Sequence, residues 1–185
     1  GFFNFVFAVN YKAEMIEEYF KDGSAYGVNI SYLRETKRLG TAGALGLFKE
    51  VPEKPFIVIN GDGLTRVKFE QMLQFHITQK AMATMGVREY SLQGPYGVVE
   101  ASGSELLGIR EKPIHRHFVS TGMYVLNPEV LQYVKVNEYL DMPVLFERLL
   151  NNQCKAAIFP VTEYWMDIGQ RADLEAADLV YKEIF

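Results

Sequence analysis

The chain has 185 residues, of which 49% are hydrophobic and 23% are charged, so it can bury the core of one domain and carries too little charge bias for a disordered segment. Its 19 basic and 23 acidic residues give a formal net charge of −4, which argues against nucleic acid or an anionic membrane as a partner. Cys154 is the single cysteine, and the apolar runs are too short for a membrane span or a signal peptide. A reducing cytoplasm is therefore the expected location.

The first half of the chain alternates predicted strands with predicted helices. It opens on an apolar, strand-like run over residues 1–9 without a leader or an initiator Met, which we interpret as a fragment. Apolar spacing predicts a helix over 12–21 that ends at Asp22-Gly23, and Thr41 is expected to cap a short helix through Phe48. The other elements predicted here are strands at 29–34, 56–59 and 83–88 and a helix at 69–79.

The second half is predicted to be β-rich at first and helical later. The expected strands are 97–101, 106–111, 118–126, 155–159 and 164–166. Three helices are expected: a short one that begins at Pro128, one that has Pro143 in its first turn and ends at Leu150, and one over 172–181. Strands that alternate with helices indicate an α/β sheet covered on both faces, with the β-rich segment as a lobe beside it.

Two aspartates follow apolar stretches, and each precedes a glycine. Asp62 comes after the run 56–59, so it should stand at the carboxyl end of a central parallel strand, where open α/β sheets bind ligands. Asp167 ends a second apolar stretch before a predicted helix. Two such carboxylates could hold a hard divalent cation, with phosphate oxygens and waters completing its shell. From the residues alone, an ordinary turn at Asp62 and a helix cap at Asp167 remain open.

The segment Glu111-Lys112-Pro113 closes another strand-like run. Pro113 should hold Lys112 extended, where its ammonium group suits a phosphate. Glu111 can accept hydrogen bonds from two vicinal sugar hydroxyls. The alternative is an exposed, ion-paired turn, which is the commoner fate of such a segment.

Small residues indicate two places where a ligand can approach the backbone. Gly40 and Thr41 lie in a turn that opens a helix and could admit a base or a ribose. This turn has neither the spacing of a dinucleotide fingerprint nor that of a P-loop. Gly97 offers a similar approach, although a plain strand start after Pro95 explains it equally well.

Taken in order, these motifs resemble those of the nucleotidyltransferases that make nucleotide sugars. The resemblance is strongest to the mannose-1-phosphate guanylyltransferase-like branch found beside CBS domains in bacterial surface-sugar pathways. It spans nearly the whole chain, and its specificity lies in the order and spacing of the motifs. These are Gly23-Ser24, Leu39 to Leu45, Asn60-Gly61-Asp62, Pro95 to Val99, Glu111-Lys112-Pro113, Gly122 to Leu126, Asp141-Met142-Pro143 and Tyr164 to Gly169.

The resemblance implies a fold and a reaction. The fold is a Rossmann-like (GT-A-like) mixed, mostly parallel sheet flanked by helices, with a small β-rich sugar-binding lobe. In the reaction, a sugar-1-phosphate oxygen attacks the α-phosphate of a nucleoside triphosphate and pyrophosphate leaves, and the branch suggests GTP. Asp62 and Asp167 would hold the catalytic Mg²⁺, and Lys112 would act on the sugar phosphate.

The resemblance also assigns the substrate contacts. Gly40 and Thr41 would lie at the nucleotide, and Gly97, Glu111 and Ser120 at the sugar. The product would be a nucleotide sugar for bacterial surface polysaccharides.

The chain departs from the family pattern in three places. The expected single domain, residues 1–185, lacks the first strand and the Gly-rich loop with Arg and Lys that grips the triphosphate. Gly63 stands where the branch has an apolar residue, and Ser120-Thr121 stand where it has Asn-Ala, so Ser120 reaches a sugar with a shorter side chain.

Two other hypotheses stay open, and the missing loop motivates the first of them. One is a catalytically inactive remnant that binds a sugar phosphate or a partner chain. The other is a glycosyltransferase. It ranks last, because such enzymes usually carry an Asp-x-Asp metal motif and Asn60-Gly61-Asp62 supplies only one aspartate. An exposed first strand would also favour a homo-oligomer.

Overall fold

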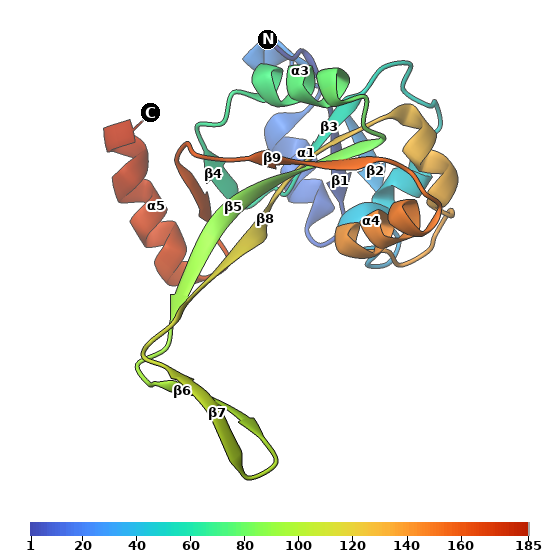
Figure 1. The fold of residues 1–185 in the computed structure, drawn as a ribbon. Coiled ribbons are helices and arrows are strands. Elements are labelled where there is room, and N and C mark those ends of the chain that lie inside the picture. Colours follow the sequence, from blue (N-terminus) through green and yellow to red (C-terminus); the bar gives the residue numbers. More distant parts are fainter. Residues whose placement is uncertain (185) are drawn as a thin grey trace.

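The computed structural model describes residues 1–184, and its centre is a four-stranded sheet in the order β3-β8-β5-β9 (Figure 1). β3 (Phe56–Ile59) and β5 (Ala83–Gln93) both run antiparallel to β8 (Ile114–Leu126), and β9 (Ala156–Pro160) runs parallel to β5. The mixed α/β fold with flanking helices is confirmed. The pairing is more antiparallel than the alternation of strands and helices predicts, because β8 returns from the lobe beside β5 and then occupies the edge of β3 as well.

The place of β3 in the sheet differs from the prediction, because β3 is an edge strand. It pairs only with β8 among the described residues, so Asp62 follows an edge strand with an antiparallel neighbour and not a central parallel strand.

Helices cover the two faces of the sheet, as the sequence predicted. Over residues 123–126 of β8, alternate side chains point to opposite faces of the sheet, and both sets are buried. Tyr124 and Leu126 join a core with α4 (Met142–Asn151), whereas Met123 and Val125 join a core with the segment around α3 (Phe69–Gln79). Figure 1 shows α3 and α4 on either side of the sheet.

A buried histidine fixes α3 to the sheet. His76 is 1% exposed; its Nδ1 lies 2.8 Å from the Thr84 hydroxyl and its Nε2 lies 2.9 Å from Asn127 Oδ1. Because the Asn127 amide nitrogen donates to the Ala81 carbonyl, its oxygen is left to accept from Nε2–H, and Nδ1 accepts from Thr84. One neutral tautomer satisfies the whole network.

Short helices connect the sheet strands on the α4 side. α2 (Gly40–Gly43) continues as a 3₁₀ helix, η2 (Ala44–Leu47), and η3 (Pro128–Tyr133) follows β8. The predicted cap is wrong in position, since Thr41 lies inside α2. Its hydroxyl instead accepts a hydrogen bond of 2.8 Å from Met142 N, so it caps α4, a helix that begins 101 residues further along the chain.

The first 35 residues form a strand-helix-strand unit. β1 (Asn4–Val9) pairs in parallel with β2 (Asn29–Arg34), and α1 (Ala13–Phe20) and η1 (Ser24–Tyr26) connect them. Within the described residues the other edge of β1 has no partner strand, and several of its apolar side chains are exposed. This confirms the predicted element order.

The β-rich lobe stands away from the body. β5 and β8 continue beyond the sheet as a two-stranded ribbon, and the hairpin of β6 (Val98–Ser102) and β7 (Glu105–Arg110) lies at its end (Figure 1). Two late elements complete the fold: β10 (Trp165–Asp167) pairs antiparallel with β4 (Gly63–Thr65), a strand that the sequence pattern did not predict, and α5 (Arg171–Ile184) follows. In the described part of the chain, no helix combines the length and apolar character needed to cross a membrane.

Candidate active site

An open cleft of about 350 Å³ lies where five segments that are distant in sequence meet. The end of β3, a bulge in β8, the adjoining starts of α2 and α4, and β10 all contribute side chains. The residues that line it are Thr41, Asn60, Ser120, Thr121, Gly122, Tyr124, Asp141, Pro143, Trp165 and Asp167.

A bulge in β8 shapes the floor of the cleft. The register shifts between Met85 and Val87 of β5, where three residues of β8, Thr121 to Met123, lie opposite Gly86 alone. Gly122 has φ +72°, and its carbonyl accepts a hydrogen bond of 2.9 Å from Asn60 N, which ties the end of β3 to the bulge. Bulges of this kind redirect side chains and are common beside active sites.

Ser120 and Tyr124 place a neutral hydroxyl pair in the cleft. Their oxygens lie 3.0 Å apart, and Gly122 N donates to Ser120 Oγ at 3.3 Å. Burial raises the pKa of the Tyr124 phenol, and the Ser120 hydrogen bond opposes this more weakly. The pair therefore stays uncharged at neutral pH and can exchange hydrogen bonds with ligand hydroxyls.

Asp62 and Asp167 are brought together by the β4–β10 ladder. Asp167 lies directly opposite Gly63, and Ile168 N donates to the Asp62 carbonyl at 2.8 Å. Both residues are exposed, and neither carboxylate has a hydrogen-bond or ion-pair partner among residues 1–184. Sequence reasoning thus paired two residues that the fold makes neighbours, although only Asp167 lines the cleft itself.

The donor set suits a hard divalent cation shared with a substrate. Carboxylate oxygens are the ligands that Mg²⁺ prefers, and it usually takes one or two from the protein and the rest from phosphates and water. The described residues contain no group of three or more metal-ligating side chains. Two exposed carboxylates on backbone segments that are hydrogen-bonded to each other therefore fit a metal that arrives with phosphate better than a metal held by protein alone.

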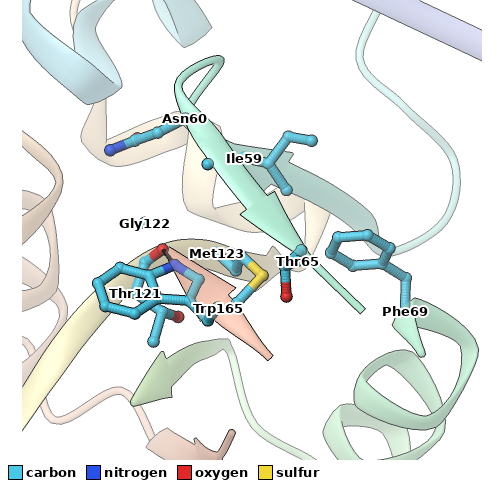
Figure 2. A pocket seen from close by; sticks show the side chains of 9 residues that line it. Ile59, Asn60, Thr65, Phe69, Thr121, Gly122, Met123 and Trp165 are labelled. Carbon is cyan, nitrogen blue, oxygen red and sulfur yellow. Dashed lines mark hydrogen bonds between the residues drawn. The ribbon is translucent and has the colours of Figure 1, made fainter. Parts of the chain in front are cut away.

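A small cavity beside the cleft is lined in part by Trp165, the single tryptophan. Figure 2 shows Trp165 beside Thr121 and Gly122, with Thr65 and Phe69 nearby. The indole Nε1 donates to the Thr121 carbonyl at 2.9 Å, so it holds the bulge from the β10 side. The cavity, about 20 Å³, has room for about one water molecule.

The predicted sugar-phosphate residues lie on the lobe, outside the lining of the cleft. Gly97 and Glu111 are neighbours across β6 and β7, since a Cβ on Gly97 would lie 3.0 Å from Glu111 Oε2. Lys112 is exposed with φ +43°, which corrects the extended conformation expected before Pro113, because the tight connection from β7 to β8 requires a left-handed residue. Its carbonyl accepts a hydrogen bond from Gln93 Nε2 at 3.1 Å.

The fold thus divides the predicted site residues into two groups. Thr41, Ser120 and Asp167 line the cleft. Gly40 precedes Thr41 in the chain, and the Asp62 carbonyl accepts a hydrogen bond from Ile168 N, next to Asp167. Gly97, Glu111 and Lys112 form a separate group on the lobe.

Sequence reasoning missed four polar or aromatic residues of the cleft as site residues: Asn60, Tyr124, Asp141 and Trp165. Asn60 directly follows an apolar strand and Asp141 precedes a proline-containing helix start, so both carried a usable signal. Tyr124 carried none, because it has the pattern of a core strand residue.

Comparisons with known proteins identify the family of the chain. The model of the family described as "Nucleotidyl transferase" matches residues 3–183, which is nearly the whole chain. The chain belongs to the nucleotidyl transferase family. The mixed sheet, the cleft and the ordered motifs can therefore be compared with those of its relatives.

Curated relatives of this family member include mannose-1-phosphate guanyltransferases from fungi. The chain is 34% identical to the protein of Schizosaccharomyces pombe and 32% identical to that of Eremothecium gossypii, in each case over 98% of this chain and 52% of the relative. It is also 33% identical to the mannose-1-phosphate guanylyltransferase catalytic subunit beta of Drosophila melanogaster, over 95% of this chain and 49% of the relative. The chain spans about half the length of the curated relatives it matches.

Solved structures show the same fold. A Bacillus anthracis protein described as a glucose-1-phosphate thymidylyltransferase aligns with a TM-score of 0.73 and 21% identity, over 97% of this chain and 76% of that one. HddC from Yersinia pseudotuberculosis aligns with a TM-score of 0.71 and 19% identity, over 96% of this chain and 78% of that one.

Proposed function

We propose that the chain carries the site of a sugar-1-phosphate nucleotidyltransferase, which forms a nucleotide sugar and pyrophosphate from a sugar-1-phosphate and a nucleoside triphosphate. The observation that carries the proposal is that the β4–β10 ladder makes Asp62 a backbone neighbour of the segment of Asp167, which lines the cleft together with Thr41 and Ser120. The family match and the named relatives support the same reaction class.

The cleft residues suit the demands of this reaction. Two anions, the sugar phosphate and the triphosphate, must meet, so the site has to offset their repulsion and hold them in line. Asp62 and Asp167 would hold Mg²⁺, which supplies positive charge to the phosphate oxygens. The Ser120–Tyr124 hydroxyls would orient a sugar, and Thr41 would face the nucleotide. No side chain of the protein has to act as the nucleophile, because the sugar phosphate supplies it.

The roles of Gly97, Glu111 and Lys112 belong to the proposal as well. Glu111 would accept hydrogen bonds from sugar hydroxyls near Gly97, and Lys112 would neutralise the sugar phosphate. These residues lie on the lobe and outside the lining of the cleft, so we expect the lobe to bend toward the body when they contact a ligand bound there.

The substrates are proposed from the relatives and from the sequence resemblance. GTP and mannose-1-phosphate are the first pair to test, because the relatives' names state mannose-1-phosphate and guanyl transfer, and the sequence resemblance suggests GTP as the donor. A cytoplasmic role in bacterial surface-polysaccharide synthesis follows from the resemblance alone.

The test is pyrophosphate release with Mg²⁺, each common nucleoside triphosphate and a panel of sugar-1-phosphates. It is run on this chain and on the same chain extended upstream in its gene, with Asp62→Asn and Asp167→Asn in whichever is active. Both variants should lose turnover by at least a hundredfold with unchanged circular dichroism, while Asp178→Asn, an exposed acid on α5, should retain it. Full activity in both site variants would refute the proposal, and sugar-phosphate binding without any turnover would support the inactive remnant.

We also propose that the chain self-associates through β1. The accessible surface of the chain is 12803 Å², whereas roughly 9,000 Å² is expected for a compact 21.1 kDa monomer. Part of the excess is the lobe, and part is the open edge of β1, where Phe3 is 63% exposed and Val6 43%. An unprotected apolar edge strand is a template for pairing. Light scattering that shows a clean monomer at high concentration would contradict this.

A further inference from the structure

The start of α2 is held to the start of α4 by a dense set of hydrogen bonds. Ala42 N and Gly43 N both donate to the Leu140 carbonyl, at 2.9 and 3.0 Å, and Leu140 N donates back to the Leu39 carbonyl at 2.8 Å. These N–H groups are the ones that a helix start usually offers to an anion. Here they are occupied, so a phosphate cannot be bound by them.

Asp141 and Thr41 complete this set through their side chains. Thr41 N donates to Asp141 Oδ1 at 3.1 Å, and Met142 N donates to Thr41 Oγ1 at 2.8 Å, so each residue caps the other's helix. The second carboxylate oxygen, Oδ2, accepts a hydrogen bond of 3.0 Å from the Tyr139 hydroxyl. That contact raises the pKa of the Tyr139 phenol and holds the carboxylate in one orientation.

Gly40 shows how closely these two segments approach. It has φ +78°, and a Cβ there would lie 2.6 Å from Asp141 Oδ1 and 2.6 Å from the Leu140 carbonyl oxygen. The residue is therefore a glycine because the segment 140–141 packs against it. The sequence-based interpretation, in which its missing side chain admits a base or a ribose, is not needed to explain it.

The same contacts decide what Thr41 can offer a ligand. Its hydroxyl oxygen accepts from Met142 N, so its own proton is directed elsewhere, and the side chain is exposed in the wall of the cleft. Thr41 thus faces the cleft as a hydrogen-bond donor, which suits an acceptor oxygen of a ribose or a phosphate.

We propose that Asp141 is a positioning residue for the nucleotide, which fixes the Gly40–Thr41 turn so that the Thr41 hydroxyl donates into the cleft. Asp141 also lines the cleft, but its negative charge disfavours direct contact with a triphosphate, and its two oxygens already accept hydrogen bonds from Thr41 and Tyr139. This role rests on the proposed function, because it presumes that a nucleoside triphosphate occupies the cleft.

The test compares Asp141→Ala with Asp141→Asn, which keeps an acceptor at Oδ1. Affinity for GTP, and for the other common nucleoside triphosphates, is measured by the fluorescence of Trp165, the single tryptophan, in the cleft wall. Asp141→Ala should weaken the best nucleotide about tenfold, and Asp141→Asn by less than threefold. The KM for sugar-1-phosphate and kcat should stay within twofold. Glu147→Gln, an exposed acid on the same helix, serves as the matched control.

A structural measurement keeps the interpretation specific. Hydrogen exchange of the Thr41 amide should be slow in the wild type and in Asp141→Asn, and fast in Asp141→Ala. Equal nucleotide affinity in the wild type and in Asp141→Ala would overturn the positioning role. An Asp141→Asn variant that binds the nucleotide as weakly as Asp141→Ala would overturn it as well, because the charge and not the hydrogen bond would then matter. A wild type that binds none of the nucleotides would instead refute the proposed function itself, and the positioning role with it.

Discussion

Replacing Gly122 by alanine probes the junction on which the cleft depends. Gly122 has φ +72°, a conformation that costs an L-residue about 1–2 kcal/mol. The new Cβ would also lie 2.7 Å from Asn60 Nδ2 and 2.9 Å from its Cγ. Moving Asn60 out of its rotamer adds roughly 0.5–1.5 kcal/mol. We expect Gly122→Ala to lower the free energy of unfolding by about 1.5–3.5 kcal/mol, or the Tm by roughly 3–14 °C for a chain of this size.

Asn60→Ala provides the control at the same place. Asn60→Ala removes the two closest contacts of the new Cβ and leaves the Cβ of residue 60 at 3.2 Å, so Gly122→Ala should then cost mainly the backbone penalty. The double variant should therefore be more stable than additivity predicts by roughly 0.5–1.5 kcal/mol. Urea unfolding followed by Trp165 fluorescence measures both terms, because the indole donates to Thr121, the neighbour of Gly122. Strict additivity, or a loss below about 0.5 kcal/mol for Gly122→Ala alone, would refute the argument that Asn60 and Gly122 are packed in contact.

Three further predictions concern stability. Leu145→Ala, at a fully buried site on α4, should cost about 2–5 kcal/mol in urea unfolding, whereas Leu150→Ala, 57% exposed on the same helix, should stay within about 0.5 kcal/mol. His76→Leu leaves both polar partners of the imidazole, Thr84 and Asn127, without their hydrogen bond, so it should lower the free energy of unfolding by roughly 2–4 kcal/mol in calorimetry. A loss under about 1 kcal/mol would show that the network contributes little. The pKa of Glu138 lies below its usual 4.5, chiefly because of its hydrogen bonds from Arg148, so this contribution is present above pH 4.5 and is lost as the pH falls below it. Glu138→Gln should flatten the decline of Tm between about pH 5 and pH 3, and an unchanged decline would contradict the assignment.

Local sequence signals predicted most of the elements because those elements are decided locally. The helix at 69–79 and the strand at 29–34 occur within the predicted bounds, since each is marked by its own periodicity and by flanking polar or turn residues. The strand 83–88 was predicted too short. Its outer half, through Gln93, pairs only with β8 in the ribbon, and exposed residues on both faces hide the alternation that identifies a half-buried strand.

Strand direction was harder to predict than strand existence. Apolar content marks 56–59 as a strand but does not say which neighbour it takes, and the partner, β8, lies more than 60 residues further along the chain. For the same reason β4 was missed, because its three residues become a strand only by pairing with β10 about 100 residues away. The proximity of Asp62 and Asp167 depends on this same short ladder, so the motifs named the two residues and long-range pairing made them neighbours.

Glycines in the cleft illustrate how a local interpretation can name the right residue for a different reason. From the local sequence, Gly40 suggests room for a ligand. In the fold that room is filled by atoms of residues 140 and 141, which the local sequence does not reveal. At Gly122 the filling atoms belong to Asn60. In both cases the glycine allows two distant segments to approach, and each contact places a polar group, the Thr41 hydroxyl or the Asn60 amide, in the wall of the cleft. A substitution at either glycine should therefore disturb ligand binding through a displaced neighbour, and removing that neighbour's side chain should relieve much of the steric cost at Gly122 but not at Gly40, where the Leu140 backbone cannot be removed.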